Sequence, residues 1–395
     1  MDGEKKEYFR KQSINRAPLK TGAGFLLGSL DIELTERCNN NCIHCYINRP
    51  GDDSASRRRE LSTRDVKEIL KEGASLGCFS VRFTGGEPLL RDDFEELYIF
   101  ARKLGLKVVL FTNACLLSES LVELFTRIPP LAEIEVSLYG MKKESYEAVT
   151  RTCGSFEKAW KGINLLLEKK VPFVVKAAML PPFKPEIREF EEWVQSNGDV
   201  IKGGRANYSM FFDLRARRDS EEKNRQIKRM RISPEDGLKI GGSNKRKSFE
   251  EMKGFCSQFM GVPGKKIFSC GAGIRGGCVD AYGNFQMCIL LRHPETVYSL
   301  KKGSMKDALL NFFPGIRERE ASDREYLKRC ARCFLKGLCE QCPAKSWMEH
   351  GVLDKPVDYL CEVAHAKARF MGLLEEGEKS WEVDGREKLK KFLEK

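Results

Sequence analysis

A repeating alternation of strand-like and helix-like segments is the feature that most restricts how this chain can fold. Polar and apolar residues alternate strictly over residues 30–35, as in a strand, and Ser62 then caps a helical pattern that runs to about residue 76. The two patterns recur about every 25–30 residues. We predict further strands at residues 79–84, 107–111, 134–138, 173–179 and 207–213, and further helices at residues 93–104, after Ser118, at 156–168 and at 186–195. Six βα units of this length imply a parallel sheet.

The polar residues within the predicted strands indicate the kind of sheet. Asp31 and Glu33 in the first strand, and Glu135 and Ser137 in the fourth, alternate with apolar residues. A closed βα barrel fills its interior with branched apolar side chains, so a polar interior favours an incomplete barrel around a solvated cavity. The alternative is a set of edge strands with one face in water. We predict an α/β fold built on a partial (β/α)6 barrel.

The cysteine content indicates metal binding in a reducing compartment. The 395 residues include 15 Cys but only 4 His, and the chain begins MDGEKKEYFRKQ, without a secretory signal pattern. An odd number of cysteines in such a chain argues against a secreted disulfide scaffold, so we expect a cytoplasmic protein. No apolar run reaches the ~18 residues of a membrane helix. A net charge of +12 is compatible with an acidic partner but does not require one.

The cysteines fall into sets with metal-ligand spacing. Cys38, Cys42 and Cys45 form a C-x3-C-x2-C triplet just past the first predicted strand, which is the catalytic rim of βα barrels. Three thiolates leave one iron of a cubane open for a substrate, although zinc with His44 as fourth ligand is an alternative. A second set consists of Cys270, Cys278, Cys288, Cys330, Cys333, Cys339, Cys342 and Cys361. The remaining cysteines are scattered, and we interpret them as small apolar residues that pack in the core. They are Cys78, Cys115, Cys153 and Cys256, of which Cys256 is the least certain.

Composition divides the chain into five segments. Residues 1–28 are predicted to form an N-terminal arm and residues 29–213 the partial barrel. Residues 214–255 are highly charged and are predicted to be a solvated linker helix. Residues 256–365 form a small cysteine-rich domain that is too poor in regular apolar pattern to fold without metal. Residues 366–395 are predicted to form an amphipathic C-terminal helix.

The triplet and two further motifs resemble the signature of the radical S-adenosylmethionine (SAM) superfamily over about residues 30–213. The second predicted strand ends in Thr84-Gly-Gly-Glu-Pro88, which is similar to the family's GGEP motif, and the fourth ends in Ser137-Leu-Tyr-Gly140. The resemblance implies a [4Fe-4S] cluster on the triplet, with SAM on its open iron. It also implies SAM contacts: the amino group of SAM with the backbone of Gly85 and Gly86 and with Glu87, its carboxylate with Arg151, and further contacts with Ser137 and His44.

The second cysteine set resembles the SPASM domain, an extension that carries two auxiliary [4Fe-4S] clusters. The opening half matches at Cys270 and Cys288, and the second half is Cys330-x2-Cys333-x5-Cys339-x2-Cys342 followed by Cys361. The resemblance implies one cluster on Cys330, Cys333, Cys339 and Cys361. It implies another on Cys270, Cys288 and Cys342, with Cys278, Cys256 or no residue as fourth ligand. Without the resemblance, a zinc ribbon is the alternative for this set.

These resemblances imply an enzyme that cleaves SAM reductively and abstracts hydrogen from a peptide or protein side chain, with the auxiliary clusters assisting oxidation. They also imply an electron donor such as ferredoxin or flavodoxin. Ile289 follows Cys288 where sulfatase-maturing members commonly have aspartate, so formylglycine formation is disfavoured. The alternatives are a tetrapyrrole side-chain decarboxylase of the haem pathway and, in another class, a zinc-binding nucleic-acid module. The sequence identifies neither a general base nor the substrate, and we expect no membrane or nucleic-acid partner.

Overall fold

A computed structural model describes residues 26–202, 207–209, 212–241, 245–259, 263–385, 387–389 and 392. Its central element is a nine-stranded, mostly parallel sheet, to which the first half of the chain contributes six strands. In sequence order these are β1 (Ser29–Thr35), β4 (Ser80–Gly85), β5 (Lys107–Thr112), β6 (Leu131–Ser137), β7 (Phe173–Ala178) and β8 (Asn207–Ser209). Neighbouring members pair in parallel, which confirms the predicted partial barrel. Within the predicted sixth strand, residues 210 and 211 lie outside the described part of the chain.

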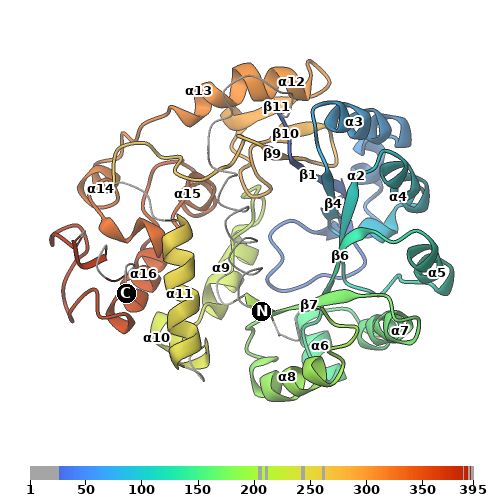
Figure 1. The fold of residues 1–395 in the computed structure, drawn as a ribbon, viewed down its shortest axis with the longest axis horizontal. Coiled ribbons are helices and arrows are strands. Elements are labelled where there is room, and N and C mark those ends of the chain that lie inside the picture. The colour runs from blue at the N-terminus through green and yellow to red at the C-terminus, as the bar shows by residue number, and fades with distance from the viewer. Residues whose placement is uncertain are drawn as a thin grey trace, which may run out of the picture.

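Helices connect these strands and cover one side of them. In Figure 1, α3, α4, α5 and α7 lie on one side of the strands, whereas α9–α11 and α14–α16 lie on the other. The connecting helices are α2 (Ser54–Arg59), α3 (Thr63–Ser75), α4 (Phe94–Lys103), α5 (Glu119–Arg127), α6 (Lys143–Thr150), α7 (Ser155–Glu168) and α8 (Ile187–Ser196). The start of α3 shows how sequence sets these bounds. Ser62 accepts a hydrogen bond from the amide of Asp65, and the Asp65 carboxylate accepts one from Ser62 in return.

The alternation predicted for β1 sorts its side chains between the two faces of the sheet. Leu30, Ile32 and Leu34 are at most 1% exposed and belong to the main apolar core, which contains residues of the covering helices. Asp31 and Glu33 lie on the opposite, inner face, because successive side chains of a strand point to opposite sides. The inner face of the sheet is therefore polar, as the sequence predicted.

Three short strands extend this sheet in a way that the sequence did not predict. They come from the cysteine-rich segment: β9 (Gly276–Val279), β10 (Asn284–Gln286) and β11 (Val297–Ser299). β9 pairs in parallel with β1, and β10 and β11 follow in antiparallel order. The cysteine-rich segment thus continues the barrel sheet at its β1 edge.

The rest of the chain is helical and differs in two places from the prediction. Where one solvated linker helix was predicted, the structure has α9 (Glu221–Met230), α10 (Pro234–Gly241) and α11 (Lys245–Phe259). The last part contains α12 (Met305–Asp307), α13 (Phe313–Arg317), α14 (Arg324–Lys328), α15 (Pro343–His350) and α16 (Asp358–Phe370). Residues 371–385 form turns rather than the predicted helix, because Gly372 and Gly377 adopt the positive φ values that end helices.

One predicted segment, the N-terminal arm, lies almost wholly outside the described residues. Residues 1–25 of the predicted N-terminal arm are outside the described part of the chain. Among the described helices, each is too short or too polar to cross a lipid bilayer.

Two phenylalanines near β4 provide a matched test of the core. Phe83 is fully buried between the sheet and its helices, whereas Phe79, just before the same strand, is 60% exposed. We expect Phe83→Ala to lower the free energy of unfolding by about 3–5 kcal/mol, because it leaves a cavity in a close-packed core. The control Phe79→Ala should change the same quantity by only about 0.5 kcal/mol. Denaturant titration of both variants checks this, and equal losses would place Phe83 outside the core.

Candidate functional site

The three cysteines of the triplet lie in a loop that begins where β1 ends. Cys38 is the last residue of the short strand β2 (Arg37–Cys38), which pairs in parallel with β3 (Arg49–Pro50). The loop is also tied to the last turn of α6, whose carbonyl oxygens accept hydrogen bonds from the amides of Asn41 and Ile43, both at 2.9 Å. Contacts within the chain therefore fix the shape of this loop.

A buried ion pair holds the start of the loop. The Nε and NH2 groups of Arg37 donate to the two carboxylate oxygens of Glu60 at 2.8 and 3.1 Å, and its NH1 donates to the carbonyl of Gly51 at 3.1 Å. Glu60 also accepts from the hydroxyl of Thr35 at 2.5 Å, so the pair reaches the last residue of β1. A bidentate pair of this kind fixes orientation as well as distance.

The three thiols face a common region. Burial raises the pKa of both Cys38 and Cys42. The charges of Glu87 and then Cys45 raise the pKa of Cys38 further, and those of Cys45 and Cys38 raise the pKa of Cys42. The amides of Asn40 and Asn48 donate to the sulfurs of Cys38 and Cys45, both at 3.4 Å. Buried thiols at close quarters ionise together only where a cation compensates them, so this donor set fits an iron cluster.

The turn after β4 packs directly on the cysteine loop. The amides of Gly86 and Glu87 donate to the carbonyls of Thr35 and Arg37 at 2.8 and 2.9 Å. A Cβ atom on Gly85 would lie 2.0 Å from the Thr35 oxygen, and one on Gly86 would lie 2.2 Å from the Arg37 oxygen. The backbone that these glycines allow to come close is that of the cysteine loop. The SAM contact predicted for them remains a prediction.

The carboxylate of Glu87 is occupied by hydrogen bonds from its own chain. It accepts from the hydroxyl of Thr112 at 2.9 Å, from the amide of Asn113 at 2.8 Å and from the amide of Leu89 at 3.2 Å. Burial outweighs these bonds and raises the pKa of the carboxyl to about 7. The side chain therefore joins the ends of β4 and β5, and the predicted contact with the SAM amino group would require one of its remaining acceptor positions.

Two other predicted SAM contacts lie near the triplet. The ring of His44 packs edge-on against Tyr139 at a centroid distance of 4.8 Å, and Phe212 lies at 5.7 Å. Burial lowers the pKa of His44 to about 4, so the ring is neutral, and its buried Nδ1 makes no hydrogen bond to the described residues. Ser137 is the last residue of β6, two positions before Tyr139. Both residues therefore come to the same end of the sheet as the triplet.

The charged segment contributes cations that the sequence analysis missed. The predicted SAM contact Arg151 is exposed and donates to the side chain of Gln226 on α9 at 2.9 Å. One turn earlier on α9, Lys223 donates to Asn48 and Asn41 of the cysteine loop at 2.7 and 3.5 Å. Burial lowers the pKa of Lys223, and the charges of Cys45 and Cys42 oppose this shift. The alternating charges of residues 214–255 are typical of a solvated helix. The sequence therefore gave no signal that Lys223 packs on the cysteine loop.

A buried polar network adjoins the triplet on the inner face. Arg292 donates to both carboxylate oxygens of Glu33 at 2.5 and 2.6 Å, and to Glu36 at 3.2 Å. The hydroxyl of Tyr282 donates to Glu36 at 2.7 Å, and Arg217 forms an ion pair with the same carboxylate. Glu33 and Glu36 are fully buried. The network thus joins the end of β1 to the cysteine-rich segment.

Four cysteines of the second set line one apolar cavity. These are Cys330, Cys333, Cys339 and Cys361, which are the four ligands predicted for one auxiliary cluster. Burial, followed by the charges of Cys333 and Cys361, raises the pKa of Cys330 to about 12. His365 also lines the cavity, but its ring nitrogens contact the carbonyl of Cys361 at 2.7 Å and the amide of Ser380 at 3.2 Å. The cavity therefore offers thiols rather than an available imidazole.

Cys288 and Cys342 form a further group, and Cys270 lies close enough to affect both of them. Burial raises the pKa of Cys288 to about 12, with Cys342 and then Cys270 adding to the shift. Burial also raises the pKa of Cys342 to about 11, and Cys270 adds to it. Within the described residues, no three His, Cys, Asp or Glu side chains converge closely enough for a single metal ion. A cubane differs from a single ion in that each thiolate binds a different iron.

The two proposed fourth ligands, Cys278 and Cys256, have surroundings of different kinds. Cys278 lies on β9 opposite Asp31, and the groups that follow burial in shifting its pKa are Glu33 and Arg292 rather than a cysteine. Cys256 lies in an apolar cluster with Phe334, and burial alone raises its pKa to about 11. The fourth ligand of this group stays a prediction, with Cys278, Cys256 or no residue as its alternatives.

We expect the buried Glu87 carboxyl to make the folded chain less stable as the pH rises. Its pKa is about 7 in the folded protein and about 4.3 in an unfolded chain. Between these values the folded state binds more protons, so the free energy of unfolding falls as the pH increases. Glu87→Gln removes this dependence. The thermal midpoint of the wild type minus that of Glu87→Gln should therefore decrease from about pH 5 to about pH 8.

The control for this measurement is Glu189→Gln, which changes an exposed glutamate of α8. Its midpoint should follow that of the wild type across the same range. A wild-type advantage over Glu87→Gln that stayed constant or grew with pH would contradict the expected effect of burial.

Comparison with known proteins finds a family model that matches part of the chain. The model of the Radical SAM superfamily matches residues 32–194. A curated relative, the AdoMet-dependent heme synthase of Methanosarcina barkeri, is 33% identical over 180 residues, which are 46% of this chain and 49% of that protein. The chain therefore matches about half the length of this relative.

Solved structures share the fold over most of the chain. Streptococcus suis SuiB bound to its precursor peptide SuiA has a TM-score of 0.63 and 18% identity, covering 91% of this chain and 81% of SuiB. Native anSMEcpe with bound AdoMet and Cp18Cys peptide has a TM-score of 0.59 and 16% identity, covering 88% of this chain and 97% of anSMEcpe. At these identities the likeness concerns the fold.

The sequence match and the geometry concern the same part of the molecule. Residues 32–194 run from β1 to α8, and they contain both the cysteine triplet and the Gly85–Glu87 turn that packs on it. The strand order and the interior polarity agree with the fold that the motifs implied. Residues 32–194 are therefore similar to the radical SAM superfamily in both sequence and fold.

Proposed function

We propose that this protein is a radical SAM enzyme that oxidises or crosslinks a side chain of a peptide or protein substrate. The observation that carries the proposal is the grouping of the cysteines into three sets, one at the ends of β1 and β4 and two in the C-terminal half. The cluster and SAM, when bound, would supply a 5′-deoxyadenosyl radical that abstracts hydrogen from the substrate.

Residues of this chain would hold and orient these groups. Cys38, Cys42 and Cys45 would bind the first cluster, in a loop that Arg37 and the Gly85–Glu87 turn keep in place. The His44 ring, neutral and packed on Tyr139, offers an aromatic face in the same region. An electron donor such as ferredoxin or flavodoxin would reduce the cluster.

The auxiliary cysteines support a role in oxidation. Cys330, Cys333, Cys339 and Cys361 would bind one cluster, and Cys270, Cys288 and Cys342 would bind another. A peptide substrate is supported by SuiB and anSMEcpe, whose folds resemble this one and which have been solved with peptides. A second candidate, a change to a tetrapyrrole side chain, is supported by the name of the M. barkeri heme synthase.

We expect replacement of Cys38, Cys42 and Cys45 together by Ala to abolish SAM cleavage and to reduce the iron content by about one third, since one of three cubanes is lost. The two auxiliary groups share no ligand with the triplet, so their iron should remain. The readouts are 5′-deoxyadenosine under anaerobic reduction and iron per chain. The control is Cys153→Ala, which changes an exposed cysteine outside the three sets.

SAM cleavage that survived the triple substitution would show that the catalytic site lies elsewhere. A colourless wild-type protein that held zinc instead of about twelve irons would overturn the radical SAM activity and favour a zinc module.

We expect Cys339→Ala to remove one auxiliary cluster and to stop substrate turnover. The thiol is one of the four that line the apolar cavity, and metal binding there is part of the folding free energy of this segment. Uncoupled SAM cleavage should persist at least in part, because the triplet keeps its ligands. Paired analysis of 5′-deoxyadenosine and of modified substrate measures both effects.

Cys256→Ala is the matched control for this variant. Cys256 packs beside the same segment, and a Cβ on Gly337 would lie 2.9 Å from its sulfur, but its surroundings are apolar. This variant should keep its full iron content. Normal turnover by Cys339→Ala would show that the cysteine-rich segment is peripheral to the reaction.

A further inference from the structure

Residues 371–385, called the C-terminal segment below, fold back onto the apolar cavity that four auxiliary cysteines line. Helix α16 ends at Phe370, and the positive φ values of Gly372 and Gly377 let the chain turn there. Trp381 then lines the same cavity as the four cysteines. The C-terminal segment follows the predicted cysteine-rich domain, which ends at residue 365, and the functions proposed above give it no role.

Apolar contacts hold the C-terminal segment on the short helix η6 (Phe334–Gly337), which lies between two of the four cysteines in the sequence. Leu373 and Leu374 belong to the same buried apolar cluster as Phe334. A Cβ atom on Gly385 would lie 2.2 Å from the Phe334 ring, so the backbone of the segment touches this ring directly. The segment is therefore packed against the part of the chain that carries the cysteines.

Ser380 brings a hydroxyl to one of the cysteine sulfurs. The residue is fully buried, and its Oγ lies 3.0 Å from the sulfur of Cys333. A thiolate that binds iron has no proton, so the hydroxyl is the donor of this pair when the site is loaded. The same sulfur also accepts from the amide of Leu335 at 3.4 Å. Ser380 thus adds a side-chain donor to a sulfur that is predicted to bind a cluster.

Neighbouring contacts fix the position of Ser380. Its amide donates to Nε2 of His365 at 3.2 Å, so Nδ1 carries the ring proton and donates to the carbonyl of Cys361 at 2.7 Å. The ring of Trp381 packs edge-on against His365 at a centroid distance of 5.3 Å, and the guanidinium carbon of Arg329 lies 5.0 Å from the Trp381 ring centre. Ser380 uses its main chain for the contact with His365, so a change of its side chain leaves this contact in place.

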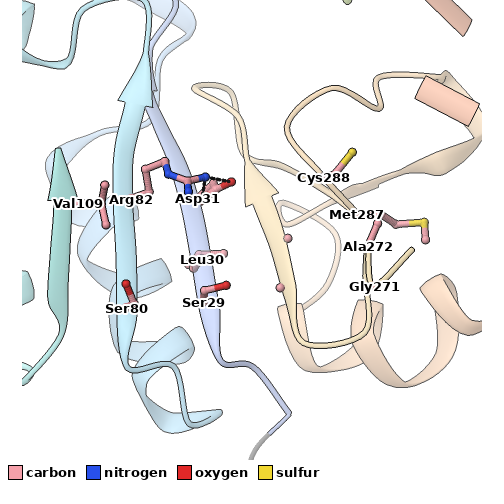
Figure 2. A pocket seen from close by; sticks show the side chains of 12 residues that line it. Ser29, Leu30, Asp31, Ser80, Arg82, Val109, Gly271, Ala272, Met287 and Cys288 are labelled. Carbon is pink, nitrogen blue, oxygen red and sulfur yellow. Dashed lines mark hydrogen bonds and ion pairs between the residues drawn. The ribbon is translucent and has the colours of Figure 1, made fainter. Parts of the chain in front are cut away.

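The other auxiliary group has different surroundings. Cys288 lines a cavity of about 230 Å³ whose other walls come from β1, β4, β5 and residues 271–287. Figure 2 shows β1 and β4 on one side of this cavity, with Arg82 paired to Asp31, and the segment that carries Cys288 on the other. Among the described residues that line it, none belongs to the C-terminal segment. A change in this segment should therefore act on one auxiliary group only.

We propose that the C-terminal segment sets the reduction potential of the cluster in the four-cysteine cavity, with the Ser380 hydroxyl as donor to Cys333. A hydrogen bond to a ligand sulfur stabilises the reduced cluster, which is more negative, over the oxidised one and so raises the potential. The proposal rests on the proposed function, because it requires an iron–sulfur cluster in this cavity. It adds a positioning residue that lies outside the cysteine motif.

The experiment measures the midpoint potential of each cluster by EPR during redox titration of the full-length, iron-loaded protein without oxygen. Repeating it with Cys38, Cys42 and Cys45 replaced by Ala removes the first cluster and so isolates the two auxiliary signals. For Ser380→Ala, the ratio of reduced to oxidised form of one auxiliary cluster at a fixed potential should fall by about threefold to tenfold. A tenfold change is about 59 mV for a one-electron couple. The potential of the other auxiliary cluster should stay the same.

Two further variants separate the hydrogen bond from structural support. Ser380→Thr keeps the hydroxyl and should keep the wild-type potential. Ser322→Ala removes an exposed hydroxyl that donates to Asp354 in the cysteine-rich segment, and it should leave both auxiliary potentials unchanged. Iron per chain is measured for each variant, so that loss of a cluster is distinguished from a shift of its potential.

A lowered potential in Ser380→Ala at full iron content, together with the wild-type value in Ser380→Thr, supports the proposal. An unchanged or raised potential in Ser380→Ala overturns it, and so does a lowered potential in Ser380→Thr. If Ser380→Ala does not retain its cluster, Ser380→Thr decides alone, since only a retained hydroxyl should preserve both cluster and potential. A wild type without iron–sulfur signals would instead contradict the proposed function.

Discussion

The pairing of β1 with strands on both of its sides is the constraint on which the structure depends. β1 has β4 on one side and β9 on the other, so the barrel and the cysteine-rich segment share one sheet. The buried contact between Glu33 and Arg292 reinforces the same junction. Removing one partner of a buried pair costs about 3–5 kcal/mol, because the other charge is left uncompensated. The positions of the auxiliary cysteines relative to the triplet therefore depend on β1.

The same strand determines the geometry of the triplet. The Thr35 and Arg37 carbonyls at its end accept the amides of Gly86 and Glu87, and Arg37 is fixed by Glu60. These contacts use backbone groups and buried charges, which allow little rotation. A cluster on the triplet would thus be held by a rim whose parts are connected to one another, as a site that must bind its cofactor in one orientation requires.

The regular part of the fold was predictable because a local sequence pattern indicates each of its strands and helices. Alternation in residues 30–35 and the Ser62 cap are signals that operate within one element. The strands β9 to β11 have only three or four residues each, and they form by pairing with β1 and with one another. No local pattern therefore indicates them. The turn after Phe370 was missed because amphipathic periodicity continues past it, although Gly372 and Gly377 mark the change.

The candidate site shows the same division. Spacing marked the triplet and the second cysteine set as candidate ligands, whereas the division of the second set into two groups came from the resemblance. Spacing alone could not show that Cys278 lies within a strand, because that strand, β9, forms by pairing with β1, where Cys278 lies opposite Asp31. Lys223 was missed because a lysine in a charged helix is usually solvated, and its burial against Asn48 is a tertiary event.

The place of β9 in the sheet has a consequence for the order of events during synthesis. β1 emerges from the ribosome early, but its partner β9 lies in the second half of the chain, since Ser29 pairs with Gly276. Until that segment has been made, one edge of β1 presents unpaired amides and carbonyls, which is the arrangement that promotes strand-to-strand aggregation. Long-range parallel pairing of this kind also forms slowly. The N-terminal half of the chain would therefore gain most from a chaperone in the interval before β9 is available.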